Sequence, residues 1–162
     1  MKQLVLGIVF FNTLLMPLVA AIAMKRFGHI KSLKMERREE RVMPFFLTVL
    51  LYGSCYYSLL QVNMPKLIAY MILGATISVF VGAVISLFWK ISIHLIGIGG
   101  FVAMLFVLFN QSLLEFRYYL MASMILAGIV GSARLIAGTH SEQQIYSGFL
   151  VGFICLLIPF LI

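Results

Sequence analysis

Charge is scarce in this chain, and that scarcity sets the class of protein. Only 10% of the 162 residues are charged, 63% are hydrophobic, and the mean hydropathy is +1.10. A soluble globular domain carries about 25% charged residues, so the composition excludes one. The alternating stretches of about ten residues that mark a transmembrane barrel are also absent. The sequence therefore predicts an all-α, polytopic membrane protein with one domain over residues 1–162.

Cysteine is equally scarce, with only Cys55 and Cys155, each inside an apolar segment. This placement predicts two buried thiols rather than a disulfide. The net charge of +7 is concentrated in one place, because seven of the twelve basic residues lie between Lys25 and Met43. Apolar runs flank that loop, so its charge indicates membrane topology or contact with anionic head groups. Nucleic-acid binding is not expected.

Six apolar runs are long enough to cross a membrane, which predicts a six-helix bundle. They are Leu4–Met24, Phe45–Val62, Leu67–Phe88, Ile91–Phe109, Tyr118–Ala137 and the run from Ser141 to the end of the chain. The first run could instead be a cleaved signal peptide, since Ala21-Ile22-Ala23 resembles a cleavage site. Its length exceeds the usual signal core of about 7–15 residues and favours a retained helix.

Local patterns predict how the helices begin and pack. Mixed charges between Lys25 and Met43 suit a short interfacial helix whose lipid-facing residues would be Ile30, Leu33 and Val42. Pro44 is expected to open the second span. Small residues recur every four positions in two spans and favour close helix packing within the chain, with a homo-oligomer through these faces as the alternative. They are Gly74, Ser78, Gly82 and Ser86 in the third span, and Gly148 and Gly152 in the sixth.

The stretch from Ser132 to Gly148 is the most polar connection between two spans. Arg134 lies near the end of an apolar run, where a charge needs a partner, a cavity or water. Gly138 could end the helix and place His140 on the turn beyond. Six spans put both termini on one side and the loops after spans one, three and five on the other. Those loops carry most of the candidate site residues, namely Lys34, Arg41, Ser92, His94, Arg134 and His140.

In order and spacing, these residues resemble the motifs of the type 2 phosphatidic acid phosphatase (lipid phosphate phosphatase) superfamily. Its first motif is Lys, six residues, Arg-Pro, and its second is Pro-Ser-Gly-His. Lys34 and Arg41 have the first spacing, with Val42 in place of proline. Ser92 and His94 fit the second, although isoleucines replace its proline and glycine.

The third family motif is Ser-Arg, five residues, His, three residues, Asp. Arg134 and His140 fit it, with Ala133 in place of serine and Gln144 in place of aspartate. The amide of Gln144 can orient an imidazole but cannot supply the charge of a carboxylate. Glu142 is close enough in sequence to be a substitute.

The resemblance implies a metal-independent, cofactor-free hydrolase acting on a lipid phosphate. His140 would be the nucleophile that forms a phosphohistidine, oriented by Gln144, and His94 would protonate the leaving alcohol and then activate water. The phosphate oxygens would be bound by Lys34, Arg41, Ser92 and Arg134. The partners implied are the lipid phosphate substrate and membrane lipids.

Two other functions stay open at this point. One is a catalytically silent relative that binds lipid phosphate or supports a membrane partner, and the other is a small transporter, which the lack of an inverted repeat disfavours. Lys34 and Arg41 could also be topogenic charges alone. Nine basic residues lie on the motif side against three on the other. The positive-inside rule therefore predicts a multi-pass protein of the inner cell membrane, with the site on the cytoplasmic face and both termini opposite.

Overall fold

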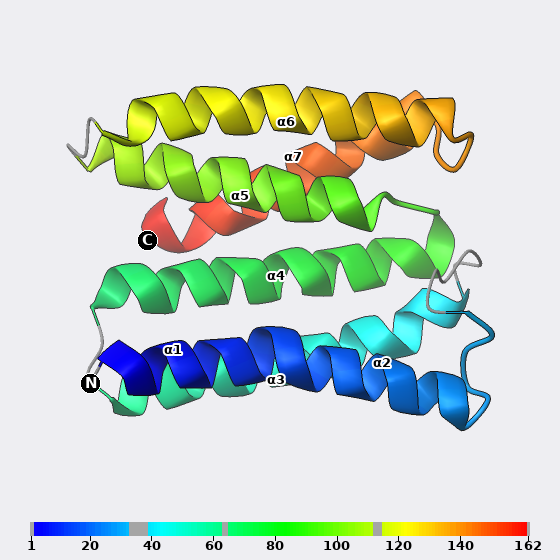
Figure 1. Ribbon diagram of the computed structural model, residues 1–162, viewed down its shortest axis with the longest axis horizontal. Helices are drawn as coiled ribbons and strands as arrows, with labels where there is room; N and C mark the ends of the chain where they lie inside the picture. The colour runs from blue at the N-terminus through cyan, green and yellow to red at the C-terminus, as the bar shows by residue number, and fades with distance from the viewer. Residues whose placement is uncertain (1, 33–38, 63–64, 112–114, 162) are drawn as a thin grey trace. The chain divides into compact units, whose positions relative to one another are not determined.

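The computed structural model describes residues 2–32, 39–62, 65–111 and 115–161, and every regular element among them is helical (Figure 1). The elements are α1 (Lys2–Phe10), η1 (Phe11–Leu15), α2 (Met16–Arg26), α3 (Glu39–Gln61), α4 (Lys66–Phe88), α5 (Ile93–Asn110), α6 (Phe116–Ile136) and α7 (Glu142–Leu161). Six helical stretches are long and apolar enough to cross a membrane, the first made of α1, η1 and α2. The all-α, multi-pass prediction is confirmed.

Two compact units divide the chain, Met1–Trp89 and Lys90–Ile162. The first contains the helices from α1 to α4, and the second contains α5, α6 and α7. The single domain expected over residues 1–162 stays a prediction.

The first span is interrupted at its middle by η1, a π-helical segment. Pro17 lies four residues after Thr13 and has no N–H, so a regular helical bond to the Thr13 carbonyl cannot form. The Tyr52 hydroxyl of α3 donates to that carbonyl instead, over 3.2 Å. The proline thus creates an acceptor inside the apolar span, and α3 satisfies it.

The connection between α2 and α3 differs from the sequence prediction. Gly28, at a φ of 77°, ends α2, and His29 N–H donates back to the Met24 carbonyl at 2.9 Å, which is a Schellman motif. Ile30 follows in irregular backbone and is only 3% exposed, so the prediction that it faces lipid from an interfacial helix is wrong. Leu33 lies outside the described residues. Pro44 lies inside α3 rather than at its start, because the helix already begins at Glu39.

The small-residue faces are used inside the chain. Gly74, Ser78, Gly82 and Ser86 of α4 are all buried. In the second unit α7 crosses α5 at glycines: a Cβ on Gly99 would meet the Phe149 carbonyl, and one on Gly152 would meet the Ile96 carbonyl. The two backbones are therefore in direct contact, and α5 and α7 run in the same direction as they cross (Figure 1). Cys55 and Cys155 are buried free thiols, as predicted.

Candidate functional site

The turn between α6 and α7 is defined by Gly138. This glycine has a φ of 61°, and its N–H donates to the Leu135 carbonyl at 2.9 Å. The next N–H, of Thr139, reaches the Arg134 carbonyl at 3.3 Å, which completes a second Schellman motif. The prediction that Gly138 ends the helix and places His140 on the turn beyond is confirmed.

Half of a capping box, the bond from the Ser141 N–H to the side chain of Gln144, begins α7 directly after His140. Ser141 precedes the helix, its carbonyl accepts the first helical bond from Ile145 N–H at 3.2 Å, and its own N–H donates to Oε1 of Gln144 at 3.3 Å. A Ser-x-x-Gln pattern gives this arrangement because the side chain at the third helical position can reach back to the N-cap amide. The bond fixes the Gln144 side chain against the turn.

The same oxygen of Gln144 contacts the imidazole of His140, with Oε1 lying 3.1 Å from Nδ1. A backbone N–H can only donate, so the atom facing Ser141 must be the amide oxygen, which is an acceptor. Nδ1 of His140 must then carry the hydrogen. In a neutral ring this tautomer leaves the lone pair on Nε2. The capping bond thereby sets the chemical form of His140.

Ser92 connects the start of α5 to the same turn of α7. Its N–H donates to the Gln144 carbonyl at 3.3 Å, and its own carbonyl lies where a Cβ on Gly148 would be 2.7 Å away. Glycine at position 148 thus allows the two helix starts to touch. Ser92 is 0% exposed, and its hydroxyl makes no hydrogen bond within the described part of the chain. A buried hydroxyl of this kind needs an acceptor.

Lys90 is a site residue that the sequence analysis missed. Its ammonium donates to the Thr139 carbonyl over 2.8 Å. This bond connects the segment before α5 with the residue that precedes His140. The motif spacings did not select Lys90. Its position two residues before Ser92 was the available signal, since any group there lies beside the start of α5.

The other predicted site residues lie in three settings. His94 is exposed on the first turn of α5, and Arg134 is half-buried in the last turn of α6. Arg41 belongs to the first unit, where it is only 4% exposed on α3. A charge buried so deeply needs hydrogen-bonding partners, which a purely topogenic arginine in the head-group region does not. Lys34 lies outside the described residues.

Glu142 does not take the role of the missing aspartate. It is exposed in the first turn of α7, where a carboxylate favours the positive end of the helix dipole. The imidazole contact belongs to Gln144. Among the predicted residues, the structure therefore brings together Ser92, His140 and Gln144, with Lys90 added.

Comparison with known proteins adds no relative. No family model, no curated protein and no solved structure matches this chain.

Proposed function

We propose that this chain is an integral membrane lipid phosphate phosphatase that works through a phosphohistidine. The observation that carries the proposal is the contact of 3.1 Å between His140 Nδ1 and Gln144 Oε1. The contact favours the tautomer in which Nε2 has the lone pair. Nε2 is the nitrogen with which His140 would attack phosphorus. An orienting acceptor on the far nitrogen is the arrangement expected for an activated imidazole.

The surroundings of His140 suit an anion. Two long helices, α5 and α7, begin at this end of the second unit, and their first N–H groups attract negative charge. The buried hydroxyl of Ser92 needs an acceptor, which a phosphate oxygen would supply. Lys90 adds positive charge at the Thr139 carbonyl. Arg134, in the last turn of α6, would add a further cation to this phosphate-binding set.

The proposed reaction proceeds in two balanced steps. Nε2 of His140 attacks phosphorus, the bond from phosphorus to the lipid oxygen breaks, and His94 gives its proton to the leaving alkoxide. Water then attacks the phosphohistidine while His94 accepts a proton from it. Inorganic phosphate leaves and both histidines return to their starting forms. Fixed positive groups stabilise the charge that develops on the phosphate oxygens.

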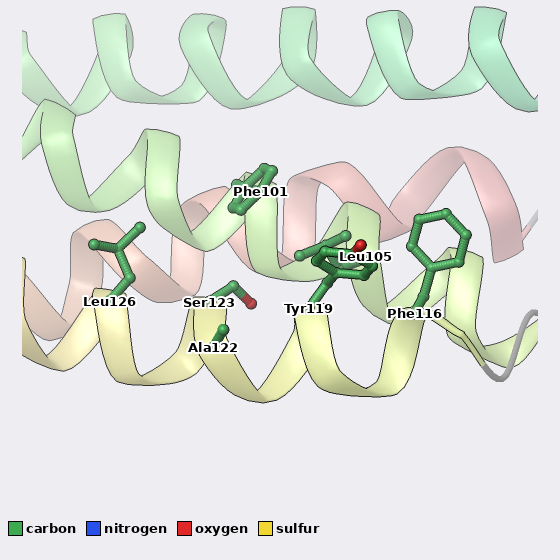
Figure 2. A pocket seen from close by; sticks show the side chains of 7 residues that line it. All are labelled: Phe101, Leu105, Phe116, Tyr119, Ala122, Ser123 and Leu126. Carbon is green, nitrogen blue, oxygen red and sulfur yellow. The ribbon is translucent and has the colours of Figure 1, made fainter.

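An apolar groove between α5 and α6 favours a lipid over a soluble phosphate ester. Its volume is about 310 Å³, and Figure 2 shows Phe101 and Leu105 of α5 facing a row of α6 side chains that runs from Phe116 to Leu126. At 1.5 Å per residue, Phe101 lies about 10 Å along α5 from His94, and Phe116 lies about 27 Å along α6 from Arg134. These are the depths that the hydrocarbon chain of a lipid would occupy with its phosphate at His140.

The charge bias of the loops supports a site on the cytoplasmic face of the inner membrane. Both termini would then lie on the opposite side.

A second function, lipid phosphate binding without turnover, has its own supporting observation. The capping bond between Ser141 N–H and Gln144 gives the amide a complete structural role. A neutral amide also stabilises a cationic imidazole less than a carboxylate does. The chain would then bind the lipid head group and serve a membrane partner.

The test is phosphate release by the purified protein in detergent, measured over phosphatidic acid, phosphatidylglycerol phosphate and prenyl pyrophosphates. The His140→Ala variant serves as the inactive reference. Binding of the same lipids is followed in parallel by quenching of Trp89 fluorescence. Turnover that disappears in the variant supports the phosphatase. Saturable binding with no turnover in the wild type would favour the silent relative instead.

A further inference from the structure

Two small side chains create the hollow of the apolar groove between α5 and α6. Ala122 and Ser123 form the middle of its α6 wall, between the larger Tyr119 and Leu126 (Figure 2). The Ser123 hydroxyl donates to the Leu120 carbonyl at 2.7 Å, so it brings no unpaired polar group to the wall. All the lining residues belong to the second unit, so α5 and α6 form the groove by themselves. Such a wall suits hydrocarbon.

The groove lies in the half of the second unit that is farther from the candidate site. The 21 residues of α6 span about 30 Å, which is the thickness of a bilayer hydrocarbon core. Leu126 is ten residues from both Phe116 and Ile136, and the other α6 lining residues all lie on the Phe116 side of it. α5 gives the same depth, because Phe101 lies at its middle and Leu105 beyond it. The groove therefore begins near the bilayer midplane and continues away from the site.

Two aromatic rings stand at the far end of the groove. Phe116 and Tyr119 are in contact, with ring centroids 6.0 Å apart and an angle of 52° between the ring planes. Both rings line the groove, and Phe116 is the first residue of α6. A chain that extends along the groove from the midplane therefore meets this pair last.

The depth of the groove distinguishes between kinds of lipid chain. The tails of a bilayer lipid end near the midplane, about 15 Å from the edge of the hydrocarbon core. With its phosphate at His140, such a tail reaches Leu126 but does not fill the hollow at Ala122 and Ser123. A chain that crosses the midplane fills it. The groove volume of about 310 Å³ is at the lower end of the range for ligand sites and suits one chain rather than two.

We propose that the groove between α5 and α6 binds the distal part of one long hydrocarbon chain of the substrate, which crosses the bilayer midplane while its phosphate lies at His140. Ala122 and Ser123 make room for the chain, and the pair of Phe116 and Tyr119 limits its length. This inference rests on the proposed function, because it takes the substrate phosphate to lie at His140. It selects lipid phosphates with a single chain longer than the tails of the surrounding bilayer.

Photolabelling locates the chain without requiring turnover. The probe is hexaprenyl phosphate with a diazirine at the end of its chain, added to the full-length protein in phosphatidylcholine vesicles. We expect label on the α6 peptide that contains Ala122. Saturating octyl phosphate, which is too short to reach the groove, should remove this label, because both phosphates compete for the same site. Label that persists would show a chain inserted from the opposite leaflet and would overturn the proposal.

Filling the hollow tests the lining residues. Ala122→Phe should raise KM for hexaprenyl phosphate about tenfold and leave KM for octyl phosphate unchanged, because each buried CH₂ changes an equilibrium constant about fourfold. The kcat values should stay the same, since the groove is distant from the reacting atoms. Met124→Phe introduces the same ring at a position on α6 that is 58% exposed and does not line the groove, so it is the matched control.

An equal rise in KM for both chain lengths in Ala122→Phe, or the same selective rise in Met124→Phe, would contradict the proposal. Photolabelling and dissociation constants report chain binding even where neither lipid is hydrolysed. Failure of the groove and failure of the phosphatase are therefore distinguishable: absence of turnover with octyl-sensitive labelling refutes only the catalysis, whereas turnover without chain-length selectivity refutes only the groove.

Discussion

Oε1 of Gln144 accepts hydrogen bonds from two groups, Nδ1 of His140 at 3.1 Å and the N–H of Ser141 at 3.3 Å. The second bond identifies the atom as oxygen, and the first then fixes the imidazole tautomer. A structural element, the first turn of α7, thus sets the tautomer of a side chain in the candidate site. The backbone carbonyl of the same residue binds Ser92 N–H at 3.3 Å, so Gln144 connects both candidate groups.

The contact predicts the effect of changing Gln144. Gln144→Glu keeps both bonds with a charged acceptor and should raise kcat about fivefold, because a hydrogen bond to a charged group is roughly 1 kcal/mol stronger. Gln144→Met has similar length but no acceptor and should lower kcat by about 10²–10⁴-fold. Steady-state kinetics and pH–rate profiles check both. Gln143→Met, at the exposed neighbouring amide, is the control, and an equal loss of kcat there would show that the effect does not come from the contact between Gln144 and His140.

Lys90 should act as a positioning residue through the Thr139 carbonyl, to which it donates at 2.8 Å. Lys90→Met should lower kcat about tenfold, the effect of losing one charged hydrogen bond, while Lys90→Arg should restore most of it. Lys66→Met, at the start of α4, is the matched control. A rise in KM alone, with kcat unchanged, would instead make Lys90 a substrate-binding group.

The close contact of α5 and α7 predicts strong sensitivity at Gly148. A Cβ there would lie 2.7 Å from the Ser92 carbonyl, so Gly148→Ala should destabilise the protein by about 1–3 kcal/mol and lower activity. Gly97→Ala in α5 has no atom within 4 Å of its new Cβ and should be neutral or stabilising by up to about 1 kcal/mol. Thermal unfolding in detergent compares the two. Equal melting temperatures would contradict the crossing.

The proposed orientation predicts which positions react from outside the cell. Ala137→Cys, exposed at the end of α6, should react with a membrane-impermeant maleimide only after permeabilisation. Gln111→Cys, exposed at the end of α5, should react in intact cells. The native thiols are buried and give little background. The reverse pattern would place the site on the outer face.

The sequence predicted the spans because a run of about 20 apolar residues has few alternatives to a membrane helix. It also predicted the helix end at Gly138, since a positive φ strongly favours glycine. It misplaced the start of α3, because hydropathy detects only the apolar part of the helix and the charged residues Glu39, Glu40 and Arg41 begin it. Ile30 was misread and Lys90 was missed, because burial and a contact with a carbonyl 49 residues away depend on tertiary structure.

The candidate site could be predicted only in part. Spacing selected His140 and Gln144, but the shared oxygen that sets the tautomer depends on the conformation of the turn. The buried hydroxyl of Ser92 likewise follows from the approach of α5 to Gly148, which spacing in the chain does not encode.

The central claim is that His140 becomes phosphorylated, and rapid-quench trapping tests it most directly. The purified protein is mixed with a ³²P-labelled lipid phosphate, quenched in base, and digested to locate the label. The account predicts a base-stable, acid-labile phosphoryl group on the peptide that contains His140, and none in His140→Ala, which should still bind lipid. Turnover by the wild type with no label on this peptide, or full turnover in the variant, would contradict the account.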